Sequence, residues 1–153
     1  MDDEAVVAEQ LGRRPRAFRR VVVRCPYGRP AVTEQWPYDS AGDPFPTTYY
    51  LTCPHLVAAI SRLEAAGGVE RWTQAVRENP DLRASLEGAN DEQRRLRPEL
   101  PGGIGGSIRG GSLKCLHAHA AFALARPGYE LGERMLADVE PLWPASGCCT
   151  DAH

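Results

Sequence analysis

The residues best suited to chemistry in this sequence stand together in "SLKCLHAHAAFAL", residues 112–124. Lys114 is the only lysine of the chain, and it is followed by a thiol at Cys115 and by imidazoles at His117 and His119. Thiolates and imidazoles are preferred ligands of zinc, and a thiol beside an imidazole is also the arrangement of a cysteine nucleophile with its base. The alanine, leucine and phenylalanine of the remainder are typical of a buried helix. The segment therefore predicts a helix that begins at a reactive site.

Two further cysteines lie where predicted strands end. The β-prone segments 18–25, 31–37 and 47–53 predict three strands, of which the first ends at Cys25 and the third at Cys53. In an antiparallel meander the first and third strands run in the same direction. A proline follows each cysteine and turns the chain sharply at that point. We therefore expect both thiols at the same edge of the sheet.

The joint pattern predicts a metal site in which Cys25, Cys53 and Cys115 converge. Three thiolates and one imidazole make a complete tetrahedral set for zinc, or a set for an iron–sulfur cluster of structural or redox role. His117 is the favoured fourth ligand, with His119 as the alternative because it shares a helical face with Cys115. On an ideal helix His117 is about 200° from Cys115, so the two converge only if Cys115 still belongs to the preceding loop.

A thiol-dependent enzyme is the main alternative, with Cys115 as the nucleophile and His117 or His119 as its base. No Asp, Asn or Glu lies near these residues in the sequence to orient the histidine, so such a group would have to come from elsewhere in the fold. Glu64 falls on a predicted helix with Arg62 nearby, and an ion pair is the expected role of that carboxylate.

A nucleic-acid or anion-binding module is the third hypothesis. Seven arginines and no acidic residue lie between Arg13 and Arg29, which makes an electropositive arm that phosphate backbones attract. The formal net charge of −2 favours an ordinary solvated strand edge instead. The glycine-rich stretch 101–111 matches no P-loop spacing and favours a connector. A weak anion site with Arg109 and Lys114 as its charges is the functional alternative.

The order of the elements predicts an α+β fold. The period-2 pattern of the three strands changes to a helical period after residue 53, and helical patterns continue to about residue 139. We expect a small N-terminal antiparallel three-stranded meander packed against four or five helices. Residues 1–17 form a lead-in, 18–140 a single domain and 141–153 a frayed tail, in which Cys148 and Cys149 are incidental.

Composition is typical of a globular cytoplasmic protein. The 153 residues are 42% hydrophobic and 25% charged, and no apolar run approaches the roughly 20 residues of a membrane span. The acidic N-terminus is unlike a signal peptide, so no membrane partner is expected. Five cysteines in a reducing compartment favour metal or redox chemistry over a disulfide framework.

The blocks "RCPYGRPAV", "PFPTTYYLTCPHL", "SRLEAAG" and "LKCLHAHAAFAL" resemble the bacterial domain-of-unknown-function family 501, which is widespread in actinobacteria. The resemblance spans about residues 18 to 137. It implies that Cys25, Cys53, Cys115 and His117 belong to the pattern of the family, but it brings no established activity. Genes of this family look to be placed near cell-division and polyphosphate-metabolism genes. The resemblance therefore implies a link to cell-division or polyphosphate proteins as partners.

Overall fold

The computed structural model describes residues 2–107 and 113–149. Its sheet has three antiparallel strands in the order β1-β2-β3: β1 (Phe18–Arg24), β2 (Pro30–Gln35) and β3 (Tyr49–Leu51). The sheet is the predicted meander, and with the helices that follow it confirms the α+β class. The strand β3 is shorter than predicted and forms one edge of the sheet.

The strands β1 and β3 end at the same edge of the sheet. Arg24, the last residue of β1, lies opposite Pro30, and Leu51, the last of β3, lies opposite Val32. Cys25 directly follows β1, and Cys53 follows the end of β3 by two residues. The Cys25 amide donates to the carbonyl of Arg29 at 2.8 Å. The Cys53 amide donates to the carbonyl of Ala31 at 3.3 Å. The two thiols therefore flank the start of β2, as the meander topology requires.

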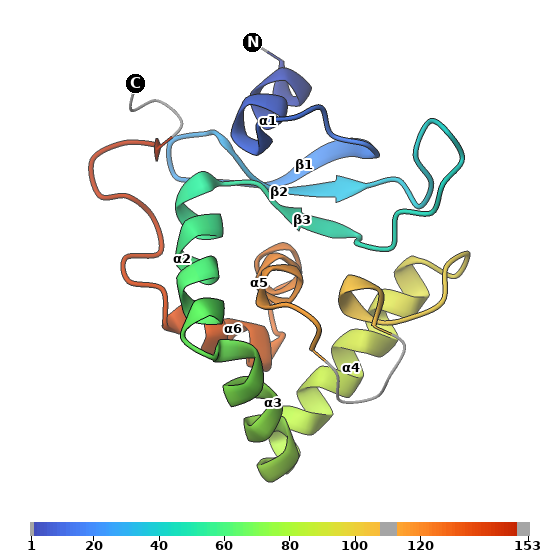
Figure 1. Ribbon diagram of the computed structural model, residues 1–153, viewed down its shortest axis with the longest axis vertical. Helices are drawn as coiled ribbons and strands as arrows, with labels where there is room; N and C mark the ends of the chain where they lie inside the picture. The colour runs from blue at the N-terminus through green and yellow to red at the C-terminus, as the bar shows by residue number, and fades with distance from the viewer. Residues whose placement is uncertain (1, 108–112, 150–153) are drawn as a thin grey trace.

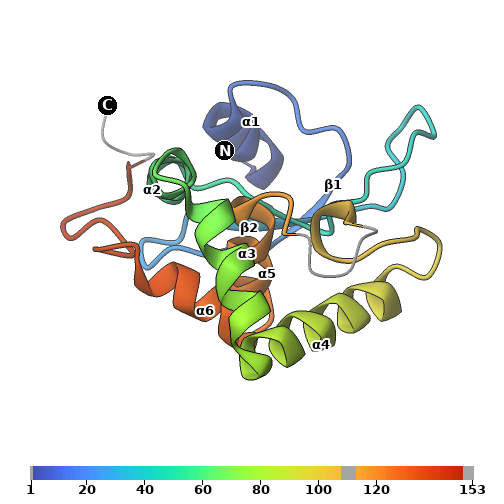
Figure 2. The same ribbon diagram turned by 60° about the horizontal axis from the view of Figure 1, so that its bottom comes forward.

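Two helices cover the two faces of the sheet (Figures 1 and 2). The helix α1 (Asp3–Leu11) lies on one face, where Val6 and Val7 are buried against β1 and β2. Asp2 caps its N-terminus by accepting from the Ala5 amide, and Gly12 ends it in the left-handed conformation. The predicted lead-in therefore contributes to the core.

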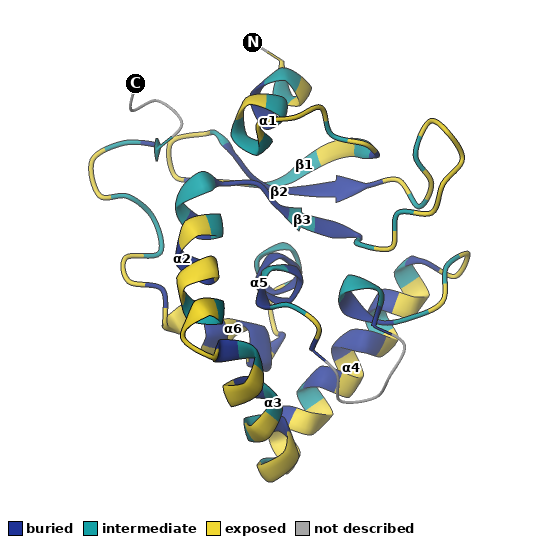
Figure 3. Cartoon of the chain, viewed as in Figure 1, coloured by how far each residue is buried: buried dark blue, intermediate teal, exposed yellow. Residues whose placement is uncertain are grey.

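The helix α5 (Leu116–Ala125) packs on the other face and is the centre of the molecule. Figure 3 shows it mostly buried, with the sheet on one side and helices on the others. Its alanines allow close approach: a Cβ on Gly132 of α6 (Glu130–Ala137) would lie 2.6 Å from the Cβ of Ala123. A helix that is apolar all round must be buried on all sides.

The remaining helices surround α5. They are α2 (Pro54–Ala65), α3 (Gly68–Glu78) and α4 (Pro80–Leu96), with a 3-10 turn at Ile104–Gly106 in the predicted glycine loop. Both α2 and α4 begin with proline, which lacks the amide that a first helical turn leaves unpaired. The described residues thus form six α-helices, one more than the largest number expected, because α1 was counted in the lead-in.

The segment after α6 crosses the edge of the sheet where Cys25 and Cys53 lie. The carbonyl of Pro141 contacts Nε2 of His55 at 2.8 Å, and the carbonyl of Pro144 accepts a hydrogen bond from the Tyr27 hydroxyl at 2.5 Å. Cys148 is buried. Up to residue 149 the tail is therefore packed, in contrast to the frayed segment expected. No helix within residues 2–107 and 113–149 is long and apolar enough to cross a membrane.

Candidate functional site

Cys115 lies immediately before the first turn of α5. Its backbone is extended, with φ −145° and ψ 152°, so it belongs to the loop and acts as the N-cap residue of the helix. The preceding residue, Lys114, has a φ of +64°, which residues with a Cβ rarely adopt. The Cys115 amide donates to the carbonyl of Leu113 at 2.7 Å, which closes a three-residue turn around Lys114. Because of this turn, the Cys115 thiol lies next to the first turn of α5, where the Ala118 amide contacts it.

Three side chains with metal-ligand chemistry meet at this point. One ligand atom each from Glu64, Cys115 and His117 lies within 4.8 Å of the other two. Oε2 of Glu64 is 3.3 Å from Nδ1 of His117, and it also accepts a hydrogen bond from the Leu116 amide at 2.7 Å. Glu64 comes from α2, 52 residues before Leu116. We call these three residues the Glu/Cys/His cluster.

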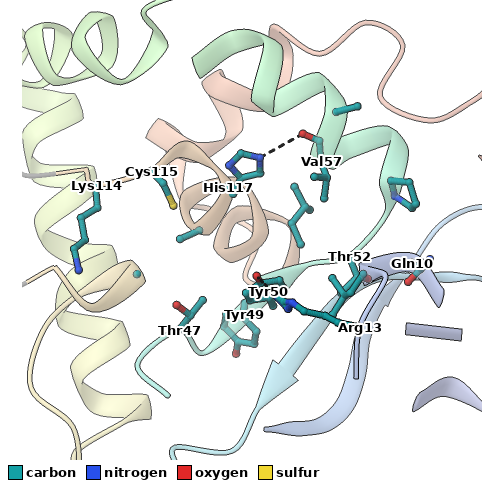
Figure 4. Close-up of a pocket in the computed structure, with 16 residues that line it drawn as sticks. Gln10, Arg13, Thr47, Tyr49, Tyr50, Thr52, Val57, Lys114, Cys115 and His117 are labelled. Atoms are coloured by element: carbon teal, nitrogen blue, oxygen red, sulfur yellow. Dashed lines mark hydrogen bonds between the residues drawn. The ribbon is translucent and has the colours of Figure 1, made fainter. Parts of the chain in front are cut away.

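The other nitrogen of the His117 ring contacts α2. Nε2 lies 3.3 Å from the carbonyl oxygen of Val57 and 3.1 Å from the hydroxyl of Ser61 (Figure 4). A carbonyl oxygen can only accept, so the contact with Val57 favours a proton on Nε2. The lone pair of a neutral His117 is then on Nδ1, the nitrogen that faces Glu64.

Within the cluster, the thiol and the imidazole shift each other toward their charged forms. Burial raises the pKa of Cys115, but hydrogen bonds from the His117 ring and from the backbone amide of Ala118 outweigh it and lower the pKa below its ordinary value. The contact with Cys115 is also the main reason that the pKa of His117 is raised, and Glu64 adds to the effect. Both shifts favour the thiolate form of Cys115 and the imidazolium form of His117.

His119, the alternative ligand, lies outside the cluster. It is fully buried, with Nδ1 at 2.7 Å from the Tyr129 hydroxyl and Nε2 at 2.8 Å from the carbonyl of Leu113. Leu113 requires the proton on Nε2, so Nδ1 accepts from Tyr129. Burial lowers the pKa of His119 to about 4, and both of its nitrogens are satisfied in the neutral form. We interpret His119 as a structural residue of the core.

Cys25 and Cys53 do not lie in the Glu/Cys/His cluster. Each is close to a cysteine of the tail: Sγ of Cys53 is 3.9 Å from Sγ of Cys149, and the thiols of Cys25 and Cys148 lie close enough to hydrogen-bond. Among the described residues, no three of these sulfurs lie within 4.8 Å of one another. The four therefore form two thiol pairs at the sheet edge, because α5 carries Cys115 to the far end of α2.

The cluster forms part of the wall of a pocket of about 800 Å³. Cys115 and His117 line it, together with residues of α1, β3 and the start of α2 (Figure 4). Lys114, one of the two predicted anion-binding residues, also lines this pocket, whereas Arg109 lies outside the described residues.

Four of the seven arginines of the N-terminal arm form ion pairs with carboxylates from other parts of the chain. The carboxylate of Glu34, on β2, is shared by two of them. The ion pairs are Arg16–Asp39 at 2.7 Å, Arg19–Glu34 at 2.8 Å, Arg20–Glu34 at 3.1 Å and Arg24–Asp3 at 2.7 Å. Nucleic-acid binding by this arm remains a prediction, and these pairs lower the positive charge that it offers.

Cys115 and His117 of the cluster are predicted from the sequence as ligands, whereas Glu64 is not. Glu64 was assigned an ion pair, and its partner is the His117 ring. The only signal for Glu64 was its place near the C-terminal end of a helix that begins beside Cys53. Only the packing of α2 against α5 brings its carboxylate to the N-terminus of α5.

The fold and the site define a small α+β protein with a Glu/Cys/His cluster at the wall of a pocket. The family model described as "Protein of unknown function (DUF501)" matches residues 21–102, more than half of the chain. The chain therefore belongs to the DUF501 family. The matched range contains Cys25, Cys53 and Glu64 but ends before Cys115 and His117. No curated protein and no solved structure matches the chain.

Proposed function

We propose that the chain is a metalloprotein in which Glu64, Cys115 and His117 bind one zinc ion beside the pocket. The observation that carries the proposal is the convergence of a carboxylate, a thiol and an imidazole within 4.8 Å. Carboxylate oxygen, thiolate sulfur and imidazole nitrogen are the three kinds of ligand that zinc takes in proteins. Iron–sulfur clusters are held mainly by thiolates, and Cys115 is the only thiol of this group.

The surroundings of His117 are those of a metal ligand. A histidine that binds a metal usually donates its other N–H to a backbone carbonyl or a carboxylate, which fixes the tautomer and the orientation of the ring. The carbonyl of Val57 supports this role, at 3.3 Å from Nε2. The carboxylate of Glu64 is oriented by a hydrogen bond from the Leu116 amide at 2.7 Å. The side chains of Glu64 and His117 are therefore both held in place by the protein itself.

A site with three protein ligands leaves a coordination position for water or for a substrate, which is the pattern of catalytic zinc. Cys115 and His117 both line the pocket, so a metal held by them would lie beside the space that a small molecule would occupy. The metal would supply a Lewis acid there. A catalytic or ligand-binding role is therefore favoured over a purely structural one.

Zinc content tests the proposal. Protein purified and dialysed against excess zinc is expected to retain about one zinc per chain, and Cys115→Ser and His117→Gln are expected to lose it. Cys149→Ser and His55→Gln are the matched controls, because they remove a thiol and an imidazole outside the cluster and should keep the metal. Zinc content that is the same in Cys115→Ser as in the wild type would rule the cluster out as the site.

A cysteine nucleophile is the second candidate, favoured by the lowered pKa of Cys115. Glu64 provides the third group that the neighbouring sequence lacks, because its carboxylate contacts the imidazole. The same samples separate the two candidates. A protein that binds no zinc, but whose Cys115 is alkylated rapidly by iodoacetamide at neutral pH, would support the nucleophile and overturn the metal site.

A further inference from the structure

The pocket beside the cluster has positive charge at both ends. Figure 4 shows Lys114 at one end and Arg13 at the other, with Cys115 and His117 between them. No acidic residue of the described chain lines the pocket, and Glu64 lies outside its lining. A concave site with cations and no carboxylate in its wall attracts negatively charged ligands.

The Arg13 end contains a buried hydroxyl group without a partner. Arg13 is itself held in place, since its Nη2 donates to the Tyr50 hydroxyl at 2.9 Å and its guanidinium lies 5.9 Å from the centre of the Tyr50 ring. Thr52 follows Tyr50 by two residues and is 1% exposed. Thr52 lines the pocket, and its buried Oγ1 has no hydrogen-bond partner within the described residues. An unpaired buried hydroxyl is unfavourable, and a polar ligand atom would satisfy it.

The wall between the two cations is mainly apolar. Leu51, Val57, Ala58 and Ala118 contribute side chains that cannot hydrogen-bond. A fully hydrated inorganic ion gains nothing from such a wall, whereas a ligand with a hydrocarbon body buries apolar surface against it.

We propose that this pocket binds a small organic anion with an elongated apolar body. Arg13 and Lys114 provide the charge that recognises it, Thr52 provides a hydrogen bond, and the apolar wall holds the body. This inference rests on the proposed function only in placing the middle of the ligand beside the metal site. The anionic group can be a carboxylate or a phosphate, because an arginine and a lysine bind both.

Binding of three probes with the same hydrocarbon chain tests the proposal. Octanoate, octyl phosphate and octan-1-ol are titrated into the wild-type protein, and the affinity is measured by calorimetry. Both anions are expected to bind at least about tenfold more tightly than the alcohol, because a charge-assisted hydrogen bond contributes more than a neutral one. The tighter of the two anions identifies the chemistry of the natural ligand. Equal affinity for octan-1-ol and the anions would overturn the proposal.

Variants locate the binding site. Arg13→Met and Lys114→Met remove the charge but keep an unbranched apolar side chain, and each is expected to weaken octanoate binding about tenfold. Arg95→Met, on the exposed face of α4, is the matched control and should bind as the wild type does. Thr52→Val removes only a hydroxyl that has no partner among residues 2–107 and 113–149, so it should weaken binding severalfold without lowering stability. Unchanged affinity in both Arg13→Met and Lys114→Met would contradict the assignment.

The metal and the anion are separated by repeating the titrations on zinc-free and on zinc-loaded protein. Anion binding that persists without zinc, with the same effects of the variants, supports the pocket assignment even if the metal site fails. Zinc binding at the cluster without any binding of the anions would overturn the pocket assignment and leave the proposed metal site intact.

Discussion

Two histidines separated by one alanine have opposite roles in this protein. His117 faces α2 and contacts Glu64, whereas His119 points into the core and pairs with Tyr129. Residues two apart on a helix are about 200° apart around its axis, so they cannot share a site. Cys115 joins His117 because it precedes the helix, where its extended backbone frees it from helical spacing. The position of the helix start therefore selects which imidazole meets the thiol.

The burial of His119 predicts a pH dependence of stability. Its pKa is lowered from 6.5 to about 4 in the folded protein, so between these pH values the unfolded chain binds more protons than the folded one. The free energy of unfolding should fall as the pH drops from about 6.5 toward 4, by up to about 3 kcal/mol from this residue.

Urea unfolding of the wild type and of His119→Gln between pH 7 and pH 4 measures this contribution. The variant should be less stable at pH 7 but should lose less stability on acidification. His55→Gln serves as the control for the loss of an imidazole outside the core. If His119→Gln and the wild type show the same slope, His119 does not have its lowered pKa. If His119→Gln does not fold, Tyr129→Phe is the second variant. It keeps the ring and removes the hydroxyl that contacts Nδ1 of His119.

The tight turn at Lys114, just before α5, sets the position of the Cys115 thiol. Lys114 adopts a φ of +64°, and the hydrogen bond from Cys115 to Leu113 spans it. This left-handed conformation costs a residue with a Cβ about 1–2 kcal/mol. The backbone of Lys114 is therefore strained, at a position where a glycine would adopt the same φ more easily. This residue is also the only lysine of the chain.

Replacement of this lysine by glycine is expected to stabilise the fold. Lys114→Gly should be about 1 kcal/mol more stable than Lys114→Met, because both lack the amine but only glycine relieves the backbone. Thermal unfolding of the two variants gives the difference. A Lys114→Gly protein that is less stable than Lys114→Met would mean that the turn is not strained.

The sequence allowed the elements to be predicted better than their contacts. The proline at Pro54, the strand pattern ending at Cys53 and the alanine-rich segment before Ala125 are local signals, and each gave the correct type of element. The pairing of Cys25 with Cys148, and of Glu64 with His117, depends on the packing of α2 and the path of the tail. No local pattern encodes such packing, so the predicted three-cysteine site was assembled from residues that the fold keeps apart.

At the scale of the whole molecule, the segment after α6 lies against the edge of the sheet where β1 and β3 end. The tail contacts the turn after β1 through Tyr27 and the start of α2 through His55. Burial raises the pKa of Cys53 to about 12, with a further contribution from Cys149, so this thiol is neutral at physiological pH. The tail therefore covers the edge of the sheet with uncharged groups, and it contributes to the core.

Removal of the tail after Trp143 is expected to destabilise the protein. The truncation loses the hydrogen bond between Tyr27 and Pro144 and exposes the thiols of Cys25 and Cys53, which are now buried. We expect a loss of about 1–3 kcal/mol in the free energy of unfolding. Chemical denaturation of the truncated and full chains measures it. A chain that ends after residue 149 is the control, and equal stability of all three would show that the tail only rests on the surface.

The 3.9 Å between the sulfurs of Cys53 and Cys149 also bears on the connectivity of the chain. Loss of two electrons and two protons to an oxidant would let these sulfurs close to the roughly 2.0 Å of a covalent bond. The backbone from Cys53 to Cys149 would then be a closed covalent loop. Every helix except α1 would belong to that loop, and so would all three residues of the Glu/Cys/His cluster. The helix α1 and the three strands would lie outside that loop, in the part of the chain before Cys53.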